Sequence, residues 1–149
     1  MCSSDLDRVV RSLGITKKDA VVADIGAGSG YFSRRLAREV PGGTVYAVDV
    51  DDEFRGYIEQ NREGWGTPNI EPHLAFYDDP ALPEKGIDLV FVSNTYPYLR
   101  SRVAYFRKVA AALKPGGVLL VGVSESLLRF GTALVCEERA GSFFYRKEG

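Results

Sequence analysis

The chain is poor in the residue types that most often build metal centres and covalent active sites. Its 149 residues include one histidine, one methionine, one tryptophan and two cysteines. The cysteines, Cys2 and Cys136, lie at opposite ends of the sequence without the close spacing of metal ligands. The sequence therefore predicts no metal site, and this cysteine usage is typical of a reducing, cytoplasmic setting.

Long apolar runs and an excess of one charge are also missing. The longest apolar stretches, residues 89–92 and 118–123, are far shorter than the ~20 residues of a membrane-spanning helix. Nineteen Lys and Arg face twenty Asp and Glu, which gives a net charge of −1. Such a chain has no basic field that would gather nucleic acid or anionic lipid. We expect neither a membrane span nor a nucleic-acid partner.

What the sequence does contain is a regular alternation of two patterns within one domain's length of chain. Short, nearly continuous apolar runs are typical of strands buried on both faces; they occupy residues 20–25, 44–50, 87–93 and 118–123, with a weaker run at 69–74. Segments of helical period separate them, at residues 31–40, 53–62 and 103–113. This alternation predicts a single α/β domain with a doubly wound, mostly parallel sheet.

The two ends of the chain depart from this alternation. Residues 134–138 and 143–147 flank a short turn and predict a hairpin that closes a seven-stranded sheet with an antiparallel strand. Residues 6–13 have helical spacing. We therefore expect an N-terminal helical segment over residues 1–19 and the folded domain over residues 20–149. The turn after residue 113, Lys-Pro-Gly-Gly, is expected to end the last of the three helices.

The strongest local signal is a glycine-rich turn between the first strand and the first helix. Gly26, Ala27, Gly28 and Gly30 lie in this turn; glycine allows costly backbone conformations and lets a ligand approach the main chain. The dinucleotide-binding fingerprint needs its third glycine at position 31, where this chain has Tyr31. The pattern therefore disfavours a pyrophosphate ligand, and with it a nucleotide-dependent dehydrogenase.

Acidic residues follow three successive strands of the expected sheet. Asp24, directly before the turn, would repel a phosphate but can accept hydrogen bonds from an ammonium group. Asp49, followed by Val50, ends the second strand and can take both hydroxyls of a ribose. Asp78 or Asp79 can accept from an adenine amine. Since ligands bind beyond the carboxyl ends of parallel strands, these acids predict a site for an adenosine with a charged amino-acid tail.

Four motifs, in this order and spacing, resemble those of the class I S-adenosylmethionine-dependent methyltransferases. They are DIGAGSG at residues 24–30, Asp49, IDLVFV at 87–92 and LKPGG at 113–117. The resemblance covers residues 20–123 and implies a Rossmann-like fold with S-adenosylmethionine as cofactor. It implies that Asp24 and the glycine turn hold the methionine end, and Asp49 and Val50 the ribose. The adenine is assigned to Asp78 or Asp79, and the edge of the reaction centre to Ser93 and Asn94.

Different parts of the chain resemble different branches of that family. The middle, residues 82–107, is similar to small-molecule and quinone-type methyltransferases. The tail, residues 122–129 and 143–147, is similar to the end of chemotaxis receptor glutamate methyltransferases, which carry an N-terminal helical domain that about nineteen residues do not provide. We therefore favour a small-molecule acceptor over a protein glutamate carboxylate. A non-catalytic S-adenosylmethionine-binding module in a larger complex is a further alternative.

The residues that act on the acceptor are not defined by any motif. A carboxylate acceptor needs no general base, whereas a phenol or amine must lose a proton, for which the candidates are His73, Tyr96 and Tyr98, with Asn94 beside them. A lone histidine such as His73 is more often structural, and the two tyrosines are equally typical of aromatic packing. Residues 94–98 also differ from the Asn-Pro-Pro-aromatic motif of amide and base N-methyltransferases, which demotes that substrate class.

Overall fold

The structure, a computed structural model, describes residues 17–92, 98–121, 134–139 and 142–148. The helical segment expected near the N-terminus therefore lies outside the described residues. The helices are α2 (Tyr31–Glu39), α3 (Asp52–Asn61) and α4 (Arg102–Ala112). The strands are β1 (Val21–Ile25), β2 (Thr44–Asp49), β3 (Ile70–Leu74), β4 (Ile87–Val92), β5 (Leu113–Val121), β6 (Leu134–Arg139) and β7 (Ser142–Lys147).

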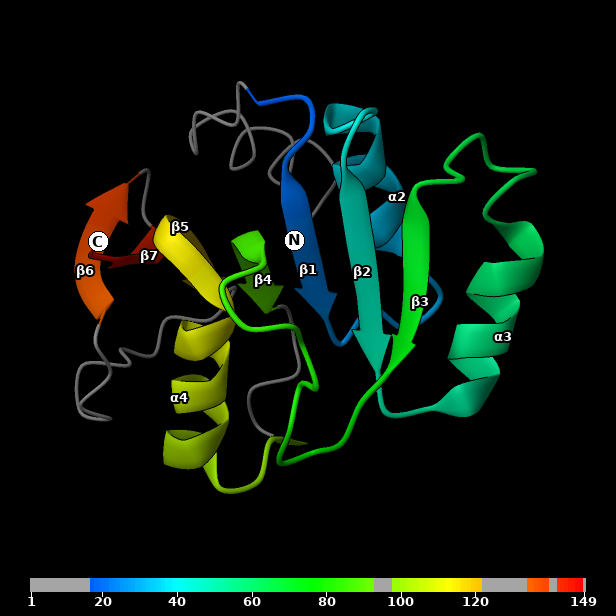
Figure 1. Ribbon diagram of the computed structural model, residues 1–149. Coiled ribbons are helices and arrows are strands. Elements are labelled where there is room, and N and C mark those ends of the chain that lie inside the picture. Colours follow the sequence, from blue (N-terminus) through cyan, green and yellow to red (C-terminus); the bar gives the residue numbers. More distant parts are fainter. Residues whose placement is uncertain (1–16, 93–97, 122–133, 140–141, 149) are drawn as a thin grey trace.

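All seven of these strands join one sheet, in the order β3-β2-β1-β4-β5-β7-β6 (Figure 1). Strands β1 to β5 pair in parallel, whereas β7 is antiparallel to both β5 and β6. The predicted single α/β sheet with a reversed C-terminal strand is therefore confirmed. The chain runs from β1 outward through β2 to β3 and then returns to β4 on the other side of β1. Because the strand order reverses at this point, a crevice is expected at the carboxyl ends of β1 and its neighbours.

Two hydrophobic clusters cover the two faces of the sheet. Along β4, Leu89 and Phe91 pack with α2 and α3, whereas Val90 and Val92 pack with α4. Successive side chains of a strand point to opposite faces, so a strand buried on both sides needs an unbroken apolar run. This explains why the central strands were recognisable from their continuous apolar sequence.

The sequence predicts that the turn at residues 114–117, with its two glycines, ends α4. In the structure α4 ends at Ala112. Leu113 is already extended, with φ −71° and ψ 138°, and it pairs with Ile87 of β4. Regular pairing resumes at Val118 opposite Leu89, so residues 114–117 form an irregularity within β5. The helix ends before the glycines because Pro115 disfavours helical backbone at the preceding residue.

Strand β3 forms although Pro72 interrupts its apolar pattern. Pro72 pairs with Ala47 of β2, and β3 lies at the end of the strand order. An edge strand tolerates proline because one side of its backbone needs no partner.

A close approach of two chain segments restricts the turn that leads into β2. A Cβ added at Gly43 would overlap the carbonyl oxygen of Ala20. Gly43→Ala should therefore lower the free energy of unfolding by at least about 2 kcal/mol, measured by urea denaturation. Gly56→Ala in α3 is the control: no described atom lies within 4 Å of its Cβ position, and alanine should raise stability by about 0.8–1.0 kcal/mol. Equal stability of the two variants would contradict this packing.

Candidate functional site

The glycine turn is attached to the end of β2 by backbone hydrogen bonds. The N–H groups of Gly26 and Ala27 donate to the carbonyl oxygen of Val48 at 2.8 and 3.0 Å. The N–H of Gly28 donates to Oδ2 of Asp49 at 2.9 Å. A Cβ at Gly28 would meet no described atom within 4 Å. The turn therefore presents open main chain directly beside the Asp49 carboxylate.

Glycine is required in this turn for its backbone conformation. Gly26, Gly28 and Gly30 have φ angles of 79°, 55° and 89°, a region that side chains with a Cβ disfavour. Gly30 is also tightly packed, since a Cβ there would lie 3.3 Å from Ile58 and 3.4 Å from Trp65. The sequence-based interpretation of these glycines as conformational residues is confirmed.

Asp49 keeps part of its hydrogen-bonding capacity. Its Oδ1 accepts from the N–H of Asp51 at 3.0 Å, and its Oδ2 accepts from the N–H of Gly28. A carboxylate has about four lone-pair sites. Two acceptor sites of Asp49 therefore remain for a ligand, and they lie at the wall of a cavity.

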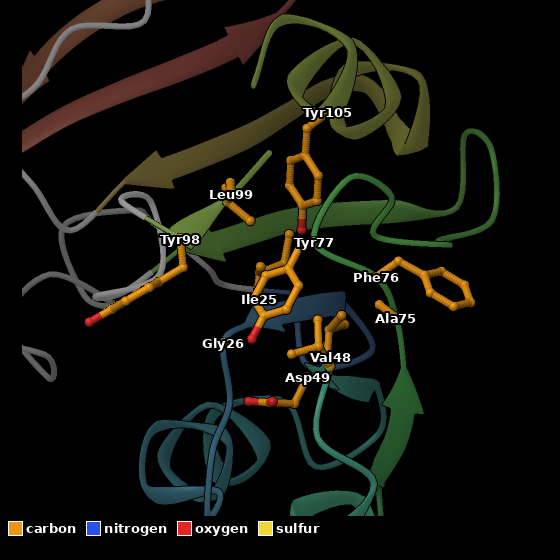
Figure 2. A pocket seen from close by; sticks show the side chains of 11 residues that line it. Ile25, Gly26, Val48, Asp49, Ala75, Phe76, Tyr77, Tyr98, Leu99 and Tyr105 are labelled. Carbon is orange, nitrogen blue, oxygen red and sulfur yellow. The ribbon is translucent and has the colours of Figure 1, made fainter. Parts of the chain in front are cut away.

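That cavity has a volume of about 310 Å³ and lies at the carboxyl ends of the central strands. Its lining includes Ile25 of β1, Asp49 and Val50 at the end of β2, the segment 75–77 after β3, and Tyr105 of α4 (Figure 2). The volume is at the lower end of the range for small-ligand sites. The predicted crevice beyond the strand ends therefore exists, with Asp49 and Val50 in its wall.

Asp24 lies on the other side of the glycine turn and does not line the cavity. Its side chain is 1% exposed, and the hydroxyl of Ser33 in α2 donates to its Oδ2 at 2.7 Å. Its Oδ1 is buried and has no hydrogen-bond partner among the described residues. Strand alternation sends Asp24 toward α2, whereas its neighbour Ile25 faces the cavity.

The environment of Asp24 favours its neutral form. Burial raises the pKa of the carboxyl to about 6, the Ser33 hydrogen bond opposes this rise, and the charge of Asp49 adds to it. Near neutral pH the folded protein therefore holds a buried carboxylate with one unpaired oxygen, which is an unfavourable arrangement in the absence of a donor.

The two acids proposed for an adenine lie beside the cavity rather than in its wall. A bridge between Phe76 and Asp79 turns the chain back after β3; as a result Phe76 and Tyr77 line the cavity. Asp78 lines an adjoining hollow of about 330 Å³ that shares Tyr77 with the cavity. Asp79 lies 3.5 Å from Nζ of Lys108 and accepts from the N–H of Ala81 at 2.8 Å.

Of the residues predicted to act on the acceptor, the structure describes His73 and Tyr98, and only Tyr98 lies at the cavity. The Nε2 atom of His73 lies 2.9 Å from the carbonyl oxygen of Ala81, and its ring packs edge-on against Tyr46. This histidine therefore connects β3 to the following loop, away from the cavity. Tyr98 lies at the rim with 68% of its surface exposed (Figure 2). Ser93, Asn94 and Tyr96 lie in the segment 93–97, which the structure does not describe.

Sequence reasoning missed three aromatic lining residues, Phe76, Tyr77 and Tyr105. None of them belongs to a motif, and Tyr105 adjoins Phe106 in a helical segment whose apolar residues suggest only core packing. In the described part of the chain, no cluster of three or more metal-ligating side chains is present. No described helix has the length and apolar character needed to cross a membrane.

The buried carboxyl of Asp24 should make stability depend on pH. A rise of its pKa from 3.8 to about 6 on folding corresponds to about 3 kcal/mol. Because the folded state holds the proton more tightly, this contribution is favourable below about pH 4 and is lost as the pH rises to about 6. Asp24→Asn, which keeps an acceptor for Ser33, should therefore exceed the wild type in stability by up to about 3 kcal/mol at pH 8.

Urea denaturation at pH 4 and pH 8 measures this effect. The advantage of Asp24→Asn should nearly vanish at pH 4. The control is Asp52→Asn, which removes an exposed carboxylate paired with Arg55 at the start of α3 and should therefore not gain stability at pH 8. An Asp24→Asn advantage that is the same at both pH values would contradict the predicted titration.

Comparison with known proteins connects this site to one family. Residues 22–117 match a family model described as a methyltransferase domain. Trans-aconitate 2-methyltransferase from Rhodopseudomonas palustris (strain BisB18) is 32% identical over 107 residues, which are 71% of this chain and 39% of that protein. Protein-L-isoaspartate O-methyltransferase from Aeropyrum pernix is 31% identical over 119 residues, which are 76% of this chain and 42% of that protein. The chain thus spans about two fifths of the length of these relatives.

A solved structure shares the fold over nearly the whole chain. The S-adenosylmethionine-dependent methyltransferase from Aquifex aeolicus superposes with a TM-score of 0.79 at 20% identity, over 95% of this chain and 88% of that one. The family match gives no support to the nucleotide-dependent dehydrogenase considered from the glycine turn. Since the family model covers well over half of the sequence and the fold agrees, the chain belongs to the class I S-adenosylmethionine-dependent methyltransferases.

Proposed function

We propose that the cavity holds S-adenosylmethionine and that the protein transfers the methyl group to a carboxylic acid, with small molecules favoured. One observation carries the cofactor assignment: Asp49 retains free acceptor sites in the cavity wall, beside the open main chain of Gly28. A ribose offers two adjacent hydroxyl donors, which match those acceptor sites.

The methionine end is assigned to the glycine turn and Asp24. An ammonium group near the turn would give the unpaired Oδ1 of Asp24 a donor, directly or through a water molecule. Leaving a buried hydrogen-bond acceptor unpaired costs about 1–3 kcal/mol. A donor on the ligand would remove this cost from the folded chain. This supports Asp24, Gly26, Ala27, Gly28 and Gly30 as the residues of that subsite.

The base end is assigned to the apolar part of the cavity. Val50, Ala75 and Leu99 supply walls for a flat ring. Of the two acids proposed for the adenine amine, Asp78 is the better placed, because Asp79 is already engaged by Lys108. Ser93 and Asn94 remain the residues proposed for the edge of the reaction centre.

Methyl transfer from S-adenosylmethionine requires mainly that the protein position the acceptor. When bound, S-adenosylmethionine supplies a methyl group that is already activated. The contribution of the protein is to align an acceptor with that group and to exclude water, and positioning of this kind is worth ~7–11 kcal/mol. Tyr98 at the rim is a candidate for acceptor contact.

A carboxylate acceptor fits the groups that surround the cavity. His73 is bonded to Ala81 outside the lining. Burial and the nearby charge of Asp79 raise the pKa of Tyr105. Its phenol therefore stays neutral and does not supply the base that a phenol or amine acceptor would need. A carboxylate needs no deprotonation at neutral pH, unlike a phenol or an amine. Two of the related proteins also have acidic acceptors in their names, trans-aconitate and isoaspartate.

The cofactor assignment predicts a specific loss of binding. Asp49→Ala should weaken binding of S-adenosylhomocysteine by roughly 100-fold, because two hydrogen bonds to a charged group are lost. Isothermal titration calorimetry measures the affinity, and a melting curve shows that the variant folds. Asp52→Ala removes an exposed acid three residues further on and should bind like the wild type. Equal affinity of Asp49→Ala and wild type would refute the proposed site.

The acceptor class predicts the chemical nature of the product. With methyl-labelled S-adenosylmethionine and a panel of small di- and tricarboxylic acids, we expect label that alkali releases as methanol, the behaviour of a methyl ester. Alkali-stable label would exclude a carboxylate acceptor. Label on protein glutamate alone would support the protein-carboxylate alternative, and cofactor binding without transfer to either class would support the non-catalytic module.

A further inference from the structure

Tyr105 combines complete burial with access to the cavity. It is the fourth residue of α4 and is only 1% exposed, yet it forms part of the cavity lining. Figure 2 shows Tyr105 reaching toward the lined space with its hydroxyl foremost, while Asp49 approaches from the opposite side. The phenol therefore brings a polar atom to the end of the cavity that lies away from the proposed ribose site.

The helix holds this side chain in a fixed position. The backbone N–H of Tyr105 donates to the carbonyl oxygen of Ser101 at 2.9 Å, and its ring packs edge-on against Phe106 at 5.6 Å. Phenylalanine would fill the same core space without bringing a polar atom into an apolar wall. A buried tyrosine hydroxyl usually has a hydrogen-bond partner, so the cavity is where a partner for it would lie.

The apolar lining between Asp49 and Tyr105 fits a flat heterocycle. Ile25, Val48 and Ala75 supply apolar contact surface, which suits the faces of a purine. The edge of adenine carries ring nitrogens that accept hydrogen bonds and an amino group that donates them. A hydroxyl can serve either role.

We propose that the Tyr105 hydroxyl recognises the polar edge of the adenine base and thereby selects adenosyl ligands. This inference rests on the proposed function, since it assumes that the cavity binds S-adenosylmethionine. The raised pKa of Tyr105 keeps the hydroxyl protonated throughout the physiological range, so it can donate to a ring nitrogen at every working pH.

The first test removes only the hydroxyl. Tyr105→Phe should bind S-adenosylhomocysteine roughly tenfold more weakly than the wild type, measured by calorimetry. Tyr145→Phe is the matched control, because Tyr145 is an equally buried tyrosine, on β7, that is not part of the cavity lining. It should bind like the wild type. Unchanged affinity in Tyr105→Phe would overturn the inference while leaving the proposed function intact.

The second test separates recognition from a merely structural role. Two analogues of S-adenosylhomocysteine carry a carbon in place of N1 or of N7 of the base, the ring nitrogens to which a hydroxyl can donate. The wild type should bind at least one of them roughly tenfold more weakly, and Tyr105→Phe should bind that analogue and S-adenosylhomocysteine equally well. Equal losses in both proteins, or no loss in the wild type for any analogue, would overturn the inference.

The two proposals fail in different ways. If the wild type does not bind S-adenosylhomocysteine, the proposed function and the role of Tyr105 fall together. If it binds, and Asp49→Ala weakens binding whereas Tyr105→Phe does not, only the role of Tyr105 is rejected. If Tyr105→Phe does not fold, the analogue series on the wild type can still overturn the role of Tyr105, because unchanged binding of both analogues would show that no ring nitrogen is recognised.

Discussion

The attachment of the glycine turn to the end of β2 is the constraint on which the site depends. Three consecutive N–H groups, from Gly26 to Gly28, donate to Val48 and Asp49. These bonds hold the turn beside the end of β2, so that Gly26 of the turn and the Asp49 carboxylate both lie in the wall of the cavity. The left-handed φ angles that this geometry needs are available to glycine at little cost. A turn of other residues would lose both the open main chain and the oriented acid.

The role proposed for the buried Asp24 sets the stability of the free protein against ligand binding. Its carboxylate is held by Ser33 on one oxygen, and the other oxygen has no partner among the described residues. Burial and the charge of Asp49 both disfavour ionisation. An arrangement that destabilises the free protein near neutral pH is useful if a cationic group arrives with the ligand. On this ground we propose Asp24 as a residue of the site, although it does not line the cavity.

The cavity has a polar residue at each end and apolar walls between them. Asp49 lies at the carboxyl end of β2 and Tyr105 on α4, and Val48 and Ala75 lie in the lining with them. Polar groups at both ends of an apolar hollow fix the orientation of a ligand as well as its affinity. This arrangement suits an elongated molecule with hydroxyls in one part and a heteroaromatic edge in another.

The sequence by itself determined the alternation of strands and helices, the reversed C-terminal strand, the glycine turn and Asp49, because all of these follow from local periodicity and from motifs within one strand–turn–helix unit. Tertiary structure alone decided which acids face the cavity. The turn at Phe76 and Asp79 carries Asp78 and Asp79 past it, and alternation along β1 sends Asp24 toward α2. Tertiary structure also decided that Tyr105 lies in the cavity lining, because this depends on how α4 packs on the sheet. That packing joins segments far apart in the chain, which no local sequence pattern predicts.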